Sequence, residues 1–465
     1  MNWRTRIVGS LAIAFFLFSS SFLLAAEMPR SLRDKVDDVA RKTLAQSGVP
    51  SASIAIVQDG AISYLQAYGD GSIAPHKAAM PSMRYSVGSI SKQFTAAAIL
   101  LLAEDGKLSV DDPVSRFVPN LTRGNEVTIR ELLSHTSGYQ DYWPQDYVMP
   151  SMLQPVTAEK ILDQWARKPL DFDPGTDWQY SNTNFVIAGL IVEKASGKPF
   201  LQFLSDRIFS PLGMKSVINI DQEHLTETDA TGYLRYAIGP LRPSPKEGKG
   251  WLFAAGELAM PAEDLAKWDI SMINQSLLKP ASYAAMERET VLKNGLGTHY
   301  GLGVGVRREL ANRAIEHGGE VSGFTAQNLV FPDKKIAVVV LTNEDAVSAS
   351  GDLATKIATL LFRDPDAARQ EEQSKAIFAG LQQGKIDRAA LTDNCNSYFT
   401  EQALKDFGDS LGPLGAPTEF TQTAKSDRGG MTFRLFEVHF AQKTLEVLER
   451  IMPDGKIEQY QVATK

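Results

Sequence analysis

A helix that is apolar on every side constrains this chain most. The run from Phe94 to Ala103 reads Phe-Thr-Ala-Ala-Ala-Ile-Leu-Leu-Leu-Ala, so its helical form has no polar face. Such a helix must be enclosed by protein, because each apolar side chain left in water loses the free energy of burial. We expect it to begin at Ser89 and to end at Asp105-Gly106, a helix-stop signal. The chain therefore needs a core on all sides of this segment.

Strand patterns lie on both sides of this helix in the sequence. An amphipathic helix is predicted over 31–45, before the first of them. The predicted strands are 52–57, 62–65, 300–306, 324–331 and 336–341, with turns at Asp59-Gly60 and Pro332-Asp333. Residues 107–290 show short helical patterns between Pro- and Gly-rich loops. The sequence thus predicts an α/β fold of the α+β type, in which helices and a helical lobe flank an antiparallel sheet.

A second, smaller unit is predicted at the C-terminus. A charged stretch, 363–373, follows the last of these strands. The region after it begins with a helical pattern and ends with strand patterns at 432–440, 443–450 and 457–462. We therefore expect a main domain, 27–362, and a small C-terminal α+β domain, 374–465, in which we find no catalytic constellation.

The N-terminus has the layout of a secretory signal. Basic residues precede a nearly unbroken apolar run, Ile7 to Leu24, which ends in Ala25-Ala26-Glu27. Small residues close the run and no basic stop-transfer segment follows, so we expect 1–26 to be a cleaved signal peptide and the protein to be secreted or periplasmic. The alternative is an uncleaved membrane anchor, because the run approaches the length that spans a bilayer.

Composition disfavours several classes of partner. The chain has 48 Lys and Arg against 55 Asp and Glu, a net charge of -7, and no dense basic block, so nucleic-acid binding is not expected. The single cysteine, Cys395, cannot form an intrachain disulfide, and the six histidines lack the spacing of metal sites. We expect no metal and no organic cofactor.

A serine and a lysine one helical turn apart form the first candidate catalytic pair. Ser89 and Lys92 stand at the start of the apolar helix, on one face of it. Burial disfavours a charged ammonium, so Lys92 can be neutral and accept the serine proton. A second Ser-x-x-Lys match, Ser276 to Lys279, is followed by Pro280, which disfavours helical geometry at the lysine.

Tyr180-Ser-Asn182 is the second candidate motif. It follows the turn signal Asp173-Pro-Gly175, and two side chains two residues apart in an extended loop can point into one cleft. Tyr180 could then relay a proton and Asn182 could hold a substrate amide. The alternative is a tyrosine packed on a helix with Asn182 as its cap.

His317-Gly318-Gly319 is the third candidate motif and leads into a predicted strand. Its two glycines would let a substrate backbone approach the strand edge, where Glu320 offers a backbone N–H. Two other tripeptides with similar spacing compete with it, at His299-Tyr-Gly301 and Lys293-Asn-Gly295. His135, by contrast, is interpreted as a structural histidine that ties a loop to its neighbours.

The three motifs in this order resemble the serine β-lactamase and D-Ala-D-Ala carboxypeptidase family, above all its class C-like branch with related esterases and D-aminopeptidases. Further segments are similar to signatures of that family, and the likeness extends over roughly 30–360. They are 84–92, 106–113, 131–138, 262–266 and 317–324. The C-terminal domain is weakly similar to cystatin-like or NTF2-like modules.

The resemblance implies a role for each motif residue. Ser89 would be the acylated nucleophile, Lys92 and Tyr180 the proton-handling pair, and Asn182 a substrate ligand. His317, Gly318 and Gly319 would line the substrate, with His317 standing where many members have lysine. The backbone N–H groups of Ser89 and Glu320 would form the oxyanion hole, since acyl transfer needs donors aimed at one developing charge.

The expected activity is hydrolysis of an amide, lactam or ester carbonyl through an acyl-enzyme at Ser89. Its substrate would be a small molecule or a peptide, including peptides derived from peptidoglycan. An esterase or a D-aminopeptidase would use the same residues, and a penicillin-binding sensor that is acylated once without turnover is a third alternative.

Overall fold

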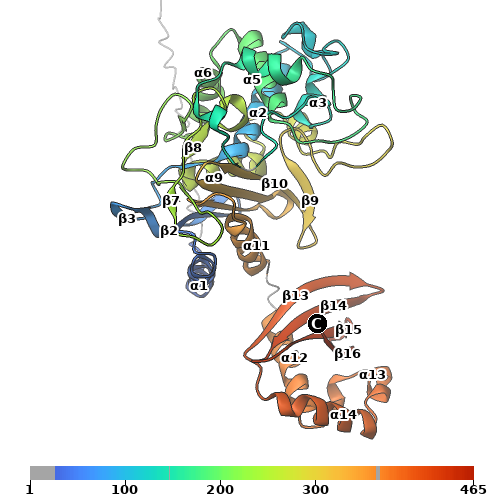
Figure 1. The fold of residues 1–465 in the computed structure, drawn as a ribbon. Helices are drawn as coiled ribbons and strands as arrows, with labels where there is room; N and C mark the ends of the chain where they lie inside the picture. Colours follow the sequence, from blue (N-terminus) through green and yellow to red (C-terminus); the bar gives the residue numbers. More distant parts are fainter. Residues whose placement is uncertain (1–26, 146, 363–366) are drawn as a thin grey trace, which may run out of the picture.

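The computed structural model describes residues 27–145, 147–362 and 367–465, which form a larger and a smaller unit (Figure 1). The predicted leader, 1–26, lies outside the described residues. Residues 363–366, from the predicted linker, also lie outside them. The rest of that linker differs from the prediction, because a helix, α12, already begins at Ala367.

A seven-stranded antiparallel sheet runs through the larger unit, in the order β3-β2-β1-β12-β11-β10-β9. Its strands are β1 (Ser51–Gln58), β2 (Ala61–Ile73), β3 (His76–Ala78), β9 (Gly305–Glu309), β10 (Asn312–Val321), β11 (Phe324–Phe331) and β12 (Ile336–Thr342). β1 pairs with β12, so the sheet joins the two ends of the region as predicted.

Helices cover both faces of this sheet. α1 (Arg30–Ser47) and α11 (Ala349–Leu361) pack on one face through Val36, Leu353 and Ile357. α9 (Ala262–Asn274) packs on the other face, where α2 (Ser91–Glu104) also reaches the sheet through a hydrogen bond of 2.8 Å from Gln93 Nε2 to Asn328 Oδ1 of β11. The remaining helices of the larger unit are α3 (Ile129–Leu133), α4 (Ala158–Ile161), α5 (Asn182–Ser196), α6 (Phe200–Leu204), α7 (Ser210–Leu212), α8 (Phe253–Gly256) and α10 (Pro280–Met286).

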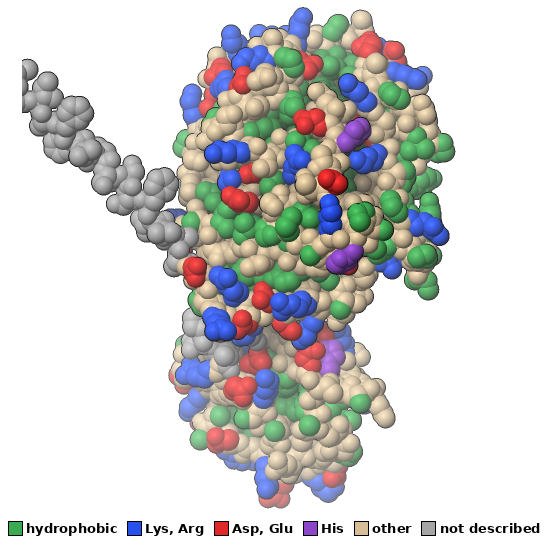
Figure 2. All heavy atoms as spheres, turned by 90° about the vertical axis from the view of Figure 1, so that its left-hand side faces the viewer, with side chains coloured by type: hydrophobic (Ala, Val, Ile, Leu, Met, Phe, Trp, Pro, Cys, Tyr) green, Lys and Arg blue, Asp and Glu red, His purple; other side chains and the backbone are tan. Residues whose placement is uncertain are grey.

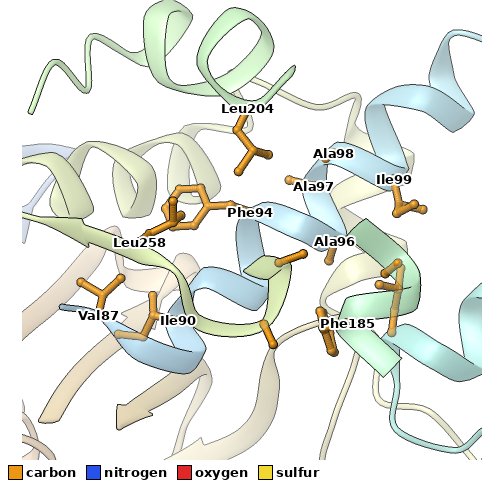
Figure 3. Close-up of a cluster of buried hydrophobic side chains, with 14 of the residues drawn as sticks. Val87, Ile90, Phe94, Ala96, Ala97, Ala98, Ile99, Phe185, Leu204 and Leu258 are labelled. Carbon is orange, nitrogen blue, oxygen red and sulfur yellow. The ribbon is translucent and has the colours of Figure 1, made fainter. Parts of the chain in front are cut away.

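The apolar helix α2 lies at the centre of the main core. Twelve of its fourteen residues are buried, including Phe94 and the alanines that follow it. Figure 3 shows these side chains against Phe185 of α5, Leu204 of α6 and Leu258 of β8. The predicted start of this helix was wrong, because Ser89 lies in a single 3₁₀ turn, η1 (Gly88–Ile90), that precedes α2. Because η1 leads directly into this buried helix, the packing of α2 in the core fixes the position of the turn.

Two predicted strands differ from the observed ones. The strand expected at 300–306 begins only at Gly305, because Gly303 turns at φ +73° over the Lys92 carbonyl and interrupts the extended backbone. His317 does not precede a strand but lies within one, β10, whose pattern is broken by its two glycines. Short strands also lie outside the seven-stranded sheet, most of them in the helical lobe: β4 (Tyr85–Ser86), β5 (Ile218–Asn219), β6 (Tyr233–Leu234), β7 (Arg242–Pro243) and β8 (Leu258–Met260).

The smaller unit has its own core. Its antiparallel sheet has the order β13-β14-β15-β16 and packs against α12 (Ala367–Leu381), α13 (Asp393–Tyr398) and α14 (Glu401–Leu411) through Phe378, Phe436 and Val447. The strands are β13 (Glu419–Arg428), β14 (Met431–His439), β15 (Thr444–Ile451) and β16 (Ile457–Thr464). The last three were predicted, and β13 was missed because its edge position leaves a polar, largely exposed sequence.

Charged side chains of both signs are mixed over the surface that Figure 2 shows, on both units. Within the described residues, no helix is long and apolar enough to cross a bilayer.

Candidate active site

The serine and lysine of the first motif meet at the start of α2. Lys92 Nζ lies 3.0 Å from Ser89 Oγ, while Ser89 itself is partly exposed. Lys92 is fully buried, and burial lowers its pKa to about 7, although the nearby charge of Asp141 acts in the opposite direction. The neutral form of Lys92 is therefore accessible near pH 7, and in that form the amine can accept a proton.

Two further acceptors hold the Lys92 amine. Asn182 Oδ1 and the Ala255 carbonyl oxygen each lie 2.8 Å from Nζ. Tyr180 hydrogen-bonds to Ser89 and places its ring 5.0 Å from Nζ. Burial raises the pKa of Tyr180, so its phenol is neutral at pH 7. The structure thus brings together the four side chains of the first two motifs.

A buried histidine positions the second motif. His135 accepts a hydrogen bond of 3.1 Å from the Ser181 N–H, and its ring stacks on Tyr180 with centroids 4.2 Å apart. This is the structural role expected for His135. The loop expected here is extended at Ser181, but it ends one residue earlier than predicted, because Ser181 is the N-cap of α5 and Asn182 is the first residue of that helix.

Asp141 is a site residue that the sequence analysis missed. Its Oδ1 accepts hydrogen bonds from the backbone N–H groups of Asn182, at 2.9 Å, and Trp143, at 3.2 Å. Its Oδ2 accepts a longer one, 3.4 Å, from Asn182 Nδ2. Burial raises the pKa of Asp141, which these hydrogen bonds and the charge of Lys92 counteract. A lone aspartate in a loop has no periodic pattern, so the sequence carries no signal for it.

Both ring nitrogens of His317 are engaged within the protein. Nδ1 lies 2.5 Å from the Gly318 carbonyl oxygen, which can only accept, so Nδ1 must carry the proton. Nε2 then accepts from the Tyr300 hydroxyl at 2.7 Å. Burial and the neighbouring Lys92 charge lower the pKa of His317 to about 4. The ring is therefore neutral at pH 7, and its lone pair is already occupied.

The glycines of the third motif allow a close approach of backbone to backbone. A Cβ at position 319 would lie 2.0 Å from the Val87 carbonyl oxygen, and one at position 88 would lie 2.7 Å from the Glu320 nitrogen. Gly88 also has φ +49°, a conformation that favours glycine. These contacts bring the turn that carries Ser89 against the backbone of Glu320, the two groups expected to form an oxyanion hole.

A cleft of about 1170 Å³ opens over these groups. Aromatic side chains supply much of its wall: Tyr142, Trp143, Tyr147, Trp178, Tyr236 and Tyr300. Ser89, Tyr180, Asn182 and residues 316–322 of β10 and its turn also line it.

The competing motifs lie elsewhere. Ser276 and Lys279 are exposed, and Lys279 precedes α10 rather than continuing a helix. Lys293 is exposed, and His299 lies at the rim of the cleft, where it contacts Glu289. In the part of the chain that is described, no group of three or more His, Cys, Asp or Glu side chains could hold a metal ion.

A serine beside a buried lysine at the start of a central helix, next to an antiparallel sheet, defines the serine hydrolases of the β-lactamase and penicillin-binding type. The sequence model of the Beta-lactamase family matches residues 36–360. The chain belongs to this family.

Several relatives share much of its length. The D-aminopeptidase of Brucella anthropi is 24% identical over 335 residues, which are 71% of this chain and 63% of that protein. Penicillin-binding protein 4* of Bacillus subtilis is 25% identical over 392 residues, 80% of this chain and 86% of that one. The solved octameric penicillin-binding protein homologue from Pyrococcus abyssi has 22% identity and a TM-score of 0.64, over 92% of this chain and 99% of that one. This last likeness concerns the fold. The chain spans less than two thirds of the D-aminopeptidase's length.

Proposed function

We propose that this chain is an exported serine hydrolase that forms an acyl-enzyme at Ser89, with Lys92 as general base. The observation that carries the proposal is the fully buried Lys92 amine 3.0 Å from Ser89 Oγ. The D-aminopeptidase and penicillin-binding relatives support a carbonyl substrate. Export rests on the signal-peptide pattern of 1–26.

The partners of Lys92 give its neutral form one useful orientation. A neutral amine has two N–H groups and one lone pair. Asn182 Oδ1 and the Ala255 carbonyl can only accept hydrogen bonds, so they take the two N–H groups. The lone pair then faces Ser89 Oγ, where it can take the hydroxyl proton.

Acylation follows from this arrangement. Ser89 Oγ attacks the substrate carbonyl carbon as its proton passes to Lys92 Nζ. The N–H groups of Ser89 and Glu320 stabilise the oxyanion that forms. As the intermediate collapses, Tyr180 passes a proton to the leaving group, which departs and leaves an ester at Ser89. Water then attacks that ester by the reverse of these proton transfers and releases the acid.

Neutral substrates suit this cleft better than carboxylates do. His317 stands where a cation would bind a substrate carboxylate, but it is neutral and both its nitrogens are engaged. Arg235 is the one Lys or Arg among the described residues of the cleft wall, and Glu344 and the Gly48 carbonyl bind it. We therefore favour an esterase or D-aminopeptidase activity over efficient hydrolysis of penicillins or peptides that end in a carboxylate.

Mass spectrometry of the intact protein tests the proposal. Mixing with p-nitrophenyl acetate should give an adduct of one acetyl group that decays as p-nitrophenol continues to be released. Ser89→Ala should give no adduct while keeping the native melting temperature, because a partly exposed hydroxyl contributes little to stability. Ser276→Ala, in the second Ser-x-x-Lys match, is the matched control and should be labelled normally.

Labelling that survives in Ser89→Ala would refute the proposal. An adduct that never decays would instead support the sensor alternative.

A further inference from the structure

Asp141 has contacts that a loop-stabilising residue does not need. Its bond to the Trp143 N–H closes a turn in its own loop and is local. Its bonds to the backbone N–H and the side-chain Nδ2 of Asn182 reach another element, the start of α5. The carboxylate also lines the cleft, close enough to Lys92 for its charge to oppose the effect of burial there.

These contacts distinguish the two ends of the Asn182 carboxamide. Both oxygens of an ionised carboxylate only accept hydrogen bonds, so the amide nitrogen must face Asp141. The amide oxygen must then face Lys92. If the carboxamide turned over, its oxygen would face the carboxylate and its NH₂ group would face the lysine N–H groups. Both contacts would become repulsive, so Asp141 selects one orientation.

We propose that Asp141 is a positioning residue for catalysis: by holding the Asn182 carboxamide with its oxygen toward Lys92, it directs the Lys92 lone pair onto Ser89. The inference rests on the proposed function, in which Lys92 is the base. Without Asp141 the carboxamide is free to present its NH₂ group to Lys92. The lysine lone pair would then be taken up by that NH₂ group instead of by the Ser89 hydroxyl.

A pair of substitutions that exchanges the two side chains gives the sharpest test. Asp141→Asn places an NH₂ group opposite the Asn182 Nδ2, two donors in contact, and should slow acetylation of Ser89 at least about tenfold. In the double variant Asp141→Asn with Asn182→Asp, the new amide at 141 donates to the new carboxylate at 182, which still accepts from Lys92. On the pH plateau above its own acid limb, acetylation of the double variant should return to within about threefold of the native plateau rate. p-Nitrophenyl acetate is the probe, because it has no amide for position 182 to bind.

The pH dependence of acetylation distinguishes two roles for Asp141. It should change if Asp141 acts on Lys92, and it should stay the same if Asp141 only stabilises its loop. Lys92 is faced by Asp141, by His135 and His317, whose pKa values are lowered, and by Tyr180, whose pKa is raised. Asp141 is therefore the charged neighbour that raises the pKa of Lys92. Removing its charge in Asp141→Asn should move the acid limb of the acetylation rate to lower pH. In the double variant the negative charge is restored nearer to Lys92, so the limb should return to the native pH or above it.

Controls separate this inference from the proposed function. Asp264→Asn changes another buried aspartate that accepts a backbone N–H, from Ser216, but does not line the cleft, so its rate and pH limb should be native. If the native protein is not acetylated at Ser89, the proposed function fails. If it is acetylated and Asp141→Asn matches it in rate and pH limb, the inference is wrong. A double variant no faster than the product of the two single effects would also refute it.

If Asp141→Asn alone fails to fold, the inference can still be tested by comparing the single variant Asn182→Asp with the double variant. In Asn182→Asp either oxygen can accept from Lys92, so the lysine no longer needs Asp141 for its orientation. Adding Asp141→Asn to that variant should then leave acetylation unchanged or faster, whereas a further loss of about tenfold would overturn the inference.

Discussion

Lys92 is fully buried, and its pKa of about 7 follows from that burial. A base must be neutral to work, and Lys92 becomes neutral as pH rises through its pKa. We therefore expect kcat/KM for a neutral ester such as p-nitrophenyl butyrate to rise with pH along an acid limb centred near pH 7. Rates measured from about pH 3 to 9 in buffers of constant ionic strength check this.

The position of that limb identifies the base. A limb centred near pH 4 would point to His317, whose pKa is about 4, and would contradict the role of Lys92. A profile without any limb between pH 5 and 9 would also contradict it. Since kcat/KM reports the free enzyme, a substrate that does not ionise is needed for the comparison.

We expect His317 to determine how efficiently substrates that carry a carboxylate are hydrolysed relative to neutral ones. Its neutral ring offers no positive charge, and a lysine at this position would. His317→Lys should raise the ratio of kcat/KM for a benzoylglycyl thioester of mercaptoacetate to that for its methyl ester by at least about tenfold, the value of one charge-assisted hydrogen bond. The two substrates differ only in the carboxylate.

A matched control for this change is His299→Lys, at the rim of the same cleft. It adds the same side chain outside the third motif and should leave the ratio near its native value. An unchanged ratio in His317→Lys together with a raised ratio in His299→Lys would show that the rim, and not β10, faces the carboxylate.

At the scale of single residues, the sequence predicts the motif residues but not what connects them. Ser89, Lys92 and Asn182 were predicted from their motifs together with the family resemblance, and the structure brings their side chains together. Their catalytic roles stay predictions. Asp141 could not be found, because its role depends on a loop folding back against α5. The Tyr300 hydroxyl that occupies His317 Nε2 comes from a further segment and was missed for the same reason.

Among the elements, the contact between the turn η1 and strand β10 leaves almost no space. Gly319→Ala would place a Cβ 2.0 Å from the Val87 carbonyl oxygen, so the strand and the turn must move apart. A shift of about 1 Å at an oxyanion hole can cost roughly 100-fold, so we expect a loss of that size in kcat with a lowered melting temperature. Steady-state kinetics and thermal denaturation measure the two effects.

Gly351→Ala is the control for this change. Gly351 lines the same cleft from α11, and a Cβ there would meet only the Gln327 side-chain oxygen, at 3.7 Å, an ordinary contact. Activity within about threefold of native is expected. Equal losses in the two variants would mean that the approach of η1 to β10 does not position the oxyanion hole.

The elements predicted best have either nearly uniform burial or a regular amphipathic pattern. The α2 and β1 segments are apolar and almost entirely buried, and α1 is amphipathic. β2 was predicted only in part, over 62–65, and extends to Ile73. The prediction failed where tertiary contacts override the local pattern. β9 begins late because Gly303 must turn over α2, and β13 is polar because it lies at a sheet edge.

At the scale of the whole molecule, the chain has separate hydrophobic cores. The larger unit has two hydrophobic clusters, and all their residues lie between Met28 and Phe362. The hydrophobic core of the smaller unit is formed by residues between Ile377 and Val462. Each unit therefore buries its own apolar surface, and every candidate catalytic residue belongs to the larger one.

This division predicts that a fragment spanning residues 27–362 folds and acts alone. Because no residue of the smaller unit belongs to either core of the larger one, removing 363–465 should leave the melting transition of the larger unit in place. The fragment should be acetylated at Ser89 by p-nitrophenyl acetate at the rate of the full chain. A fragment of 374–465 is the complementary sample and should show no labelling. If the first fragment is insoluble, or if its acetylation is more than about tenfold slower while it remains folded, the smaller unit must support the fold or the site of the larger one.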